Sequence, residues 1–154
     1  MAYVFDGEYH VLKGKTHTLR QDAKDAMKEK YESARDEEDI DGMFRYSKGF
    51  MKLDKGMIAE SKELLEAMGI AVVQAPGEGE FQAAALVMSG EAYAVASQDY
   101  DALVVGGTRL IQNLTLAKKR KLANGDFVYI APEVIEHTRV LNELGLNGDQ
   151  LICL

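Results

Sequence analysis

The sequence predicts an α/β fold in which a mostly parallel sheet is sandwiched by helices. Two apolar stretches with the length of buried strands, 70–73 and 92–96, flank an alanine-rich stretch at 81–89 that favours a helix. A strand, a helix and a second strand in this order are typical of a right-handed parallel crossover. With 154 residues, of which 47% are hydrophobic, the chain can bury a core of its own as a single domain.

The chain opens with a short apolar stretch, 3–5, which predicts a strand that ends at Asp6 and Gly7. A strand this short needs neighbours on both sides, so we expect that a preceding N-terminal strand is missing. Residues 8–15 are expected to be irregular. The stretch 18–34 favours a helix, because it is rich in Ala, Lys, Glu, Arg and Met. Its apolar stripe is thin, so this helix is expected to stand off the body of the domain.

The acidic run at 36–39 is expected at a loop or at the tip of a helical hairpin. Asp54 is placed to cap a helix that runs to residue 68, where Gly69 would supply the left-handed conformation that ends helices. Apolar residues at helical spacing predict that one face of this helix packs in the core. These residues are Met57, Ile58, Leu64, Leu65 and Met68.

The last third of the chain predicts two further strands, at 110–114 and 127–130. The basic run 118–121 between them is either a solvated loop or a contact for the phosphate groups of a nucleic acid. A proline suits the first turn of a helix, so we expect a helix over 132–144 that ends at Gly145.

Two pairs of carboxylates follow the two strands of the predicted crossover. Glu78 and Glu80 come after the first strand, and Asp99 and Asp101 come after the second. Because ligands of open α/β sheets bind beyond the carboxyl ends of the strands, we expect these side chains at one edge of the sheet. Like charges ~4 Å apart repel by roughly 1 kcal/mol in water and about 4 kcal/mol at an effective dielectric of 20. The cluster therefore needs a counter-charge, and a hard divalent cation such as Mg²⁺ or Mn²⁺ is the simplest one.

Each pair taken alone has an ordinary explanation. An acidic residue near the start of a helix is favoured by the helix dipole. An Asp-x-Asp pair also occurs in phosphatases, in glycosyltransferases and in turns. Two such pairs at the ends of successive strands indicate a metal site more strongly than either one does.

The motifs around these acids resemble those of the structure-specific 5′ nuclease superfamily, and the archaeal flap endonucleases are the nearest match. The resemblance covers essentially the whole chain. It rests on four segments in the same order: YVFDG at 3–7, APGEGEFQAA at 75–84, ASQDYDAL at 96–103 and LIQNLT at 110–115. It implies a PIN-like 5′ nuclease core that spans 1–154 as one truncated domain, with a helical arch inserted over about 8–54.

The resemblance also implies which residues act. The implied metal ligands are Asp6, Glu78 and Glu80, mainly for one ion, and Asp99 and Asp101 for the other. Two ions suit phosphodiester hydrolysis, because one generates hydroxide and both stabilise the charge of the transition state.

Glu80 is also counted among the implied catalytic residues, together with Lys13 and Arg20. These two cations would orient the scissile phosphate, since arginine pairs with phosphate oxygens through its planar fork and lysine supplies a point charge. The alternative is that Lys13 and Arg20 are ordinary solvated charges.

The function implied by the resemblance is that of a metal-dependent 5′ flap endonuclease or exonuclease core, acting on branched or 5′-flap DNA in replication and repair. One alternative is a catalytically incomplete fragment that binds metal and DNA, because the family's first and last metal-binding aspartates have no counterpart here. A phosphatase of the haloacid dehalogenase type is a further alternative. It is disfavoured, because its nucleophile loop and later lysine are not evident.

The net charge of −7 argues against a nucleic-acid partner, since such domains usually carry a basic surface. However, five of the 25 acidic residues belong to the implied metal site, where bound divalent ions would cancel much of their charge. We therefore expect weak DNA affinity unless metal is present and the missing C-terminal part of the family protein is supplied.

No apolar run approaches the ~20 residues needed to span a bilayer, so we expect a soluble chain without a membrane partner. The resemblance implies a cytoplasmic, nucleoid-associated location in an archaeon, or a nuclear one in a eukaryote. It implies a sliding clamp as a partner of the full-length family protein, whose usual C-terminal tail is absent here. An unpaired sheet edge would also allow a swapped or edge-paired dimer.

Overall fold

The structure is a computed structural model that describes residues 1–8, 10–51, 53–115, 119–122 and 125–154. The chain divides into two compact units. A helical unit comprises Met1–Ala2 and Tyr9–Val72, and a mixed unit comprises Tyr3–Glu8 and Val73–Leu154. The mixed unit contains both strands and helices, which alternate between residues 73 and 112, in agreement with the predicted α/β class.

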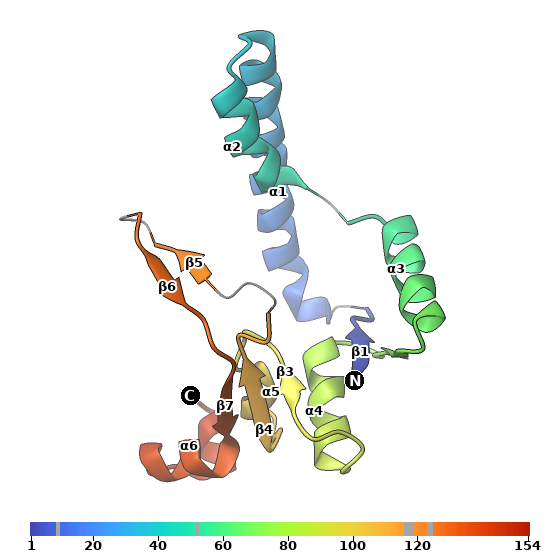
Figure 1. The fold of residues 1–154 in the computed structure, drawn as a ribbon, viewed down its shortest axis with the longest axis vertical. Helices are drawn as coiled ribbons and strands as arrows, with labels where there is room; N and C mark the ends of the chain where they lie inside the picture. The colour runs from blue at the N-terminus through green and yellow to red at the C-terminus, as the bar shows by residue number, and fades with distance from the viewer. Residues whose placement is uncertain (9, 52, 116–118, 123–124) are drawn as a thin grey trace. The chain divides into compact units, whose positions relative to one another are not determined.

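The helical unit contains η1 (Val11–Lys13), α1 (Gly14–Asp36), α2 (Ile40–Phe50) and α3 (Lys55–Ala67). Helices α1 and α2 pack side by side as a hairpin (Figure 1), and the rings of Tyr31 and Phe50 meet edge to face with their centroids 5.1 Å apart. At the tip, the carboxylate of Asp39 accepts the N–H of Gly42 at 3.0 Å and caps α2. The acidic run therefore lies at a hairpin tip, as predicted.

The irregular segment predicted at 8–15 is shorter than expected. The ring Nδ1 of His10 accepts the N–H of Leu12 at 3.3 Å, and this bond caps the short helix η1. Helix α1 then begins directly at Gly14. The prediction of irregular structure was wrong for residues 11–15, because a side-chain cap starts the helical conformation earlier than composition suggests.

Helix α3 begins and ends as predicted, but it buries less than predicted. Asp54 accepts the N–H of Met57 at 2.8 Å, and Gly69 ends the helix with a φ of 73°. Three of the five apolar side chains expected in the core are exposed instead: Met57, Leu64 and Met68. The core-face prediction was wrong for these three, since periodic spacing leads to burial only where another element covers the stripe.

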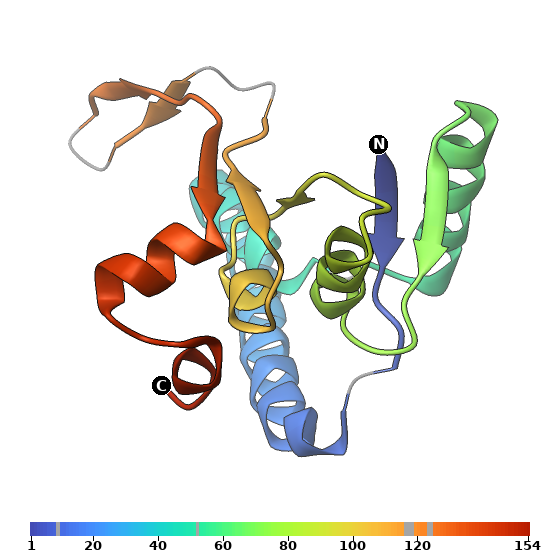
Figure 2. The same cartoon turned by 90° about the horizontal axis from the view of Figure 1, so that it is seen from below.

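The mixed unit carries the remaining elements. Strands β1 (Ala2–Phe5) and β2 (Ala71–Gln74) form a two-stranded sheet. They run in the same direction (Figure 2). The first residues of both strands belong to the helical unit. The elements that follow are α4 (Gly79–Met88), β3 (Val95–Ala96), α5 (Asp101–Val104), β4 (Arg109–Gln112), β5 (Lys119–Lys121), β6 (Phe127–Tyr129), β7 (Glu133–Glu136), α6 (His137–Leu144) and α7 (Gly148–Ile152).

The core of the mixed unit surrounds the central strand β4. This strand pairs in parallel with β3 and antiparallel with β7, and its Leu110 is completely buried. Helices α4 and α5 contribute the other buried side chains of this cluster, together with β3. They are Ala84, Val87, Val95, Ala102 and Leu103.

The helix predicted over 132–144 is wrong in its first part, because residues 133–136 form strand β7. In β7, Ile135 is paired with Leu110 of β4 and packs against the core. Only the second part is helical, as α6, which ends at Gly145 with a left-handed φ of 66°. The interstrand pairing outweighs the local preference of proline for a helix start.

The predicted crossover and the predicted basic loop also differ from the structure. Strand β3 spans only two residues, and β2 and β3 belong to different sheets within the described part of the chain. Residues 119–121 of the basic run form β5, which pairs with β6 as an antiparallel hairpin. Lys118 lies outside the described residues.

Among the described residues, no helix combines the length and the apolar character needed to cross a lipid bilayer.

Candidate metal centre

The predicted carboxylates come from neighbouring ends of elements in the mixed unit. Asp6 follows β1, Glu78 directly precedes α4, and Glu80 lies in the first turn of α4. Asp99 lies in the loop after β3, and Asp101 begins α5. Asp6 and Asp99 therefore follow strands, whereas Glu78, Glu80 and Asp101 lie at helix starts, where backbone N–H groups are free to bind anions or acidic side chains.

A hydrogen bond joins the end of β1 to the start of α4. The Oδ1 atom of Asp6 accepts the N–H of Gly79 at 2.6 Å. A Cβ atom at position 79 would lie only 2.8 Å from that oxygen, so a larger residue there would displace the Asp6 carboxylate from its present position. The N–H of Gly7 adds a second link, donating to the carbonyl oxygen of Gly77 at 2.6 Å. These contacts fix Asp6 beside the segment that carries Glu78 and Glu80.

The carboxylate of Glu80 is bound on one side only. Its Oε1 atom accepts a hydrogen bond from the hydroxyl of Ser97 at the end of β3. Its Oε2 atom is buried and has no hydrogen-bond partner among the described residues. A buried carboxylate oxygen without a partner costs free energy, because it has lost its hydration. A cation bound at Oε2 would remove that cost, so this atom fits the role of a metal ligand.

The loop that carries Asp99 is held by two side chains. The hydroxyl of Ser97 accepts the N–H of Asp99 at 3.1 Å. From β4, the Nε2 of Gln112 donates to the carbonyl oxygen of Gln98 at 2.8 Å, and its Oε1 accepts a longer bond of 3.4 Å from the hydroxyl of Tyr100. The residues on both sides of Asp99 are therefore tied to β4, Gln98 through its backbone and Tyr100 through its side chain.

Side-chain and backbone hydrogen bonds thus connect the segments of Asp6, Glu80 and Asp99. They do not assemble a finished metal site: in the part of the chain that is described, no three Asp, Glu, His or Cys side chains are placed to hold an ion together. Asp6, Asp99 and Asp101 have exposed side chains. The donor chemistry fits a hard divalent cation, since every predicted ligand is a carboxylate.

The two predicted phosphate-binding cations lie in the helical unit. Lys13 ends η1, and Arg20 lies in the first half of α1. Both side chains are exposed. Their role stays a prediction.

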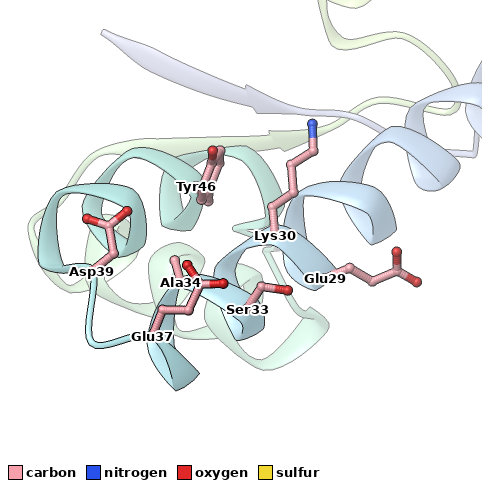
Figure 3. A pocket seen from close by; sticks show the side chains of 7 residues that line it. All are labelled: Glu29, Lys30, Ser33, Ala34, Glu37, Asp39 and Tyr46. Carbon is pink, nitrogen blue, oxygen red and sulfur yellow. The ribbon is translucent and has the colours of Figure 1, made fainter.

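Two pockets lie outside the predicted ligand set. One of about 340 Å³ is formed by α1, α2 and the turn between them (Figure 3), and none of the predicted site residues lines it. The other, of about 430 Å³, lies in the mixed unit and is lined by Gln98 and Tyr100, the neighbours of Asp99. It also includes Arg120 from the basic run and Tyr129, whose ring lies 4.8 Å from the Nζ of Lys119.

The sequence did not reveal Ser97 or Gln112 as parts of the site. Ser97 stands two residues before Asp99, so its position was visible in the ASQDYD motif. Its bond to Glu80 joins residues 17 positions apart in the chain, and Gln112 lies 14 positions from Gln98. Only the packing of β3, β4 and α4 brings these partners together.

Comparison with known proteins identifies relatives along the whole chain. Flap endonuclease 1 of Staphylothermus marinus is 46% identical over 152 residues, which make up 98% of this chain and 43% of that protein. Flap endonuclease 1 of Pyrococcus furiosus is 43% identical over 152 residues, covering 98% of this chain and 45% of that protein. The chain therefore spans less than half the length of these relatives.

Solved structures agree with the sequence relatives. The flap endonuclease-1 structure from Methanococcus jannaschii matches with a TM-score of 0.61 and 39% identity, over 98% of this chain and 44% of that one. The catalytic core of Rad2 in complex with DNA substrate matches with a TM-score of 0.63 and 25% identity, over 96% and 37%. These matches confirm the predicted fold class and the predicted resemblance to archaeal flap endonucleases.

The family comparison covers the part of the chain that contains four of the five predicted ligands. The XPG I-region matches residues 69–154, which is more than half of the sequence. The chain therefore belongs to the XPG I-region family.

Proposed function

We propose that this chain forms the core of a divalent-metal-dependent, structure-specific 5′ nuclease that hydrolyses DNA phosphodiesters. The observation that carries the proposal is the carboxylate of Glu80, with one oxygen bound by Ser97 and the other buried without a partner among the described residues. The similarity to proteins named flap endonuclease 1, and to a Rad2 core in complex with DNA, supports the same reaction.

The proposed ligands are Asp6, Glu78 and Glu80, mainly for one ion, and Asp99 and Asp101 for a second. When bound, such ions lower the pKa of a coordinated water and stabilise the charge of an in-line displacement. Mg²⁺ suits these ligands, and Mn²⁺ is an alternative with the same preference for oxygen. The chain's contribution is to hold the carboxylates at adjoining element ends.

Asp6 contributes by fixing the start of α4. Its bond to the N–H of Gly79 satisfies one of the free donors of the helix N-terminus and places Glu80 one residue further along the first turn. Because the described acids do not yet form a complete ligand set, the side chains of Asp99 and Asp101 would turn toward the ion as it binds. Their exposure leaves them free to rotate.

The substrate we propose is branched or 5′-flap DNA. Lys13 and Arg20 would orient the scissile phosphate, and residues of about 8–54 would form the arch of the nuclease. Arg120 and Tyr129, which line the pocket beside Gln98 and Tyr100, would add a phosphate contact and an aromatic surface for DNA.

A second candidate function is metal-dependent DNA binding without cleavage. It is favoured by the described acids, no three of which are placed to hold an ion together. The two candidates predict the same requirement for metal but differ in whether the phosphodiester is broken.

The test is incubation of the 154-residue chain with a 5′-flap DNA in Mg²⁺ or Mn²⁺, with a chelator in the control and an unbranched duplex of the same sequence as the matched substrate. We expect metal-dependent cleavage of the flap DNA and little cleavage of the duplex. Metal-dependent binding of the flap without cleavage would support the second candidate. Hydrolysis of a small phosphomonoester but not of DNA would contradict both and would favour a phosphatase.

A further inference from the structure

We propose that Ser97 is a positioning residue of the metal centre, which aims the Glu80 carboxylate at the ion and couples it to the loop of Asp99. The inference rests on the proposed function, because it assumes that Glu80 is a metal ligand. It adds a residue that carries no charge and does not itself bind the ion.

The hydroxyl of Ser97 acts as both a hydrogen-bond donor and an acceptor. It has one proton to donate, and that proton goes to Oε1 of Glu80. One of its lone pairs accepts the N–H of Asp99 at 3.1 Å. A hydroxyl that accepts one hydrogen bond becomes a better donor in the next, so the two bonds strengthen each other. The hydroxyl therefore links a proposed ligand of one ion to the backbone of a proposed ligand of the other.

The bond to Ser97 explains why Glu80 stays in an otherwise unfavourable position. Glu80 is only partly buried, yet its Oε2 atom is enclosed and makes no hydrogen bond within the described structure. Without a partner at Oε1, the side chain would reach a state of lower free energy by turning toward solvent. Ser97 opposes that rotation, so Oε2 remains inside before the ion arrives. Outer hydrogen-bond partners of this kind orient the ligands of protein metal sites.

Gln112 separates this role from the simpler role of ordering the loop. It binds the carbonyl oxygen of Gln98 and the hydroxyl of Tyr100, but no hydrogen bond between Gln112 and Glu80 is present in the described structure. If loop order alone mattered, loss of either Ser97 or Gln112 should weaken metal binding to a similar degree. If Ser97 orients Glu80, loss of Ser97 should weaken metal binding more than loss of Gln112 does.

The test measures Mn²⁺ binding to the 154-residue chain by electron paramagnetic resonance titration, without DNA. Ser97→Ala is expected to weaken Mn²⁺ binding by about 10- to 100-fold, the range found when outer hydrogen-bond partners of metal ligands are removed. Ser89→Ala is the matched control, because Ser89 donates to Glu91 at 2.8 Å just beyond the far end of α4. This control should leave Mn²⁺ affinity unchanged.

A pair of isosteric variants covers the case in which Ser97→Ala does not fold. Ser97→Thr and Ser97→Val have nearly the same shape but differ in the hydroxyl, so thermal unfolding should show similar stability. We expect the threonine variant to bind Mn²⁺ nearly as tightly as the unmodified chain and the valine variant to bind it far more weakly. Combining Ser97→Ala with Glu80→Gln should weaken binding little more than Glu80→Gln alone, because Ser97 acts on the ion through the Glu80 carboxylate, whose charge Glu80→Gln has already removed.

The outcomes separate this inference from the proposed function. Equal Mn²⁺ affinity in the threonine and valine variants would overturn the role of Ser97 and leave the metal centre intact. A Gln112→Ala variant that binds Mn²⁺ as weakly as Ser97→Ala would have the same consequence. If the unmodified chain binds no Mn²⁺, the metal centre itself is wrong, and the inference fails together with the proposed function.

Discussion

Replacement of Glu80 by glutamine is expected to reduce metal-dependent cleavage of flap DNA by roughly 10²- to 10³-fold, the loss typical when one preorganised electrostatic group is removed from an active site. Glutamine has almost the same size, and its amide oxygen can still accept the hydrogen bond from Ser97. The variant therefore removes the negative charge while keeping the packing. The single-turnover cleavage rate, measured over a range of Mg²⁺ concentrations, checks this expectation.

The matched control for this experiment is Glu91→Gln. Glu91 also accepts a hydrogen bond from a serine, Ser89, but its side chain is exposed and lies beyond the far end of α4. This variant should cleave at the rate of the unmodified chain. A Glu80→Gln variant that cleaves equally well at low Mg²⁺ would exclude Glu80 as a ligand and remove the main support for the proposed reaction.

Truncation of Leu110 to alanine is expected to lower the free energy of unfolding by about 2–5 kcal/mol, the range measured for leucine-to-alanine changes in protein cores. Leu110 has 0% exposure and lies on the central strand, between β3 and β7. Whole domains are stable by only about 5–15 kcal/mol, so this single change would remove a large share of the total. Urea unfolding followed by circular dichroism measures the difference.

Leu114→Ala provides the comparison, because the same atoms are deleted from a side chain that is 58% exposed. Its free energy of unfolding should change by no more than about 0.5 kcal/mol, as is usual for surface positions. If the two alanine variants proved equally stable, the core would not be organised around β4 as described. The placement of Gln112, which lies at the end of that strand, could then not be explained by the core.

The features that the sequence predicted well depend on short-range chemistry. The cap at Asp54 and the left-handed glycines at 69 and 145 are set by neighbouring residues, and all three have the predicted conformation. The acidic motifs are also set by short-range chemistry, since Glu78 and Glu80 occupy the helix start that Pro76 and Gly77 predict. The structure places these features where the motifs put them.

The features that were missed depend on partners distant in the chain. Residues 133–136 have a proline before them and a helix after them, yet their pairing with β4 makes them a strand. The apolar stripe of α3 predicted burial, but periodicity does not reveal whether another element covers it. The role of Ser97 could not be predicted for the same reason, because a hydroxyl identifies its partner only after the chain has folded.

The buried, unpaired oxygen of Glu80 also bears on how this protein would respond to laboratory evolution. In the absence of an ion, such an oxygen makes the native state less stable than a neutral or apolar side chain of similar size would. A screen that rewarded thermal tolerance alone, carried out in chelator, would favour variants that have discarded this carboxylate. Selection for thermal stability would therefore need to be carried out with the ion present, so that Glu80 is retained because it binds the ion.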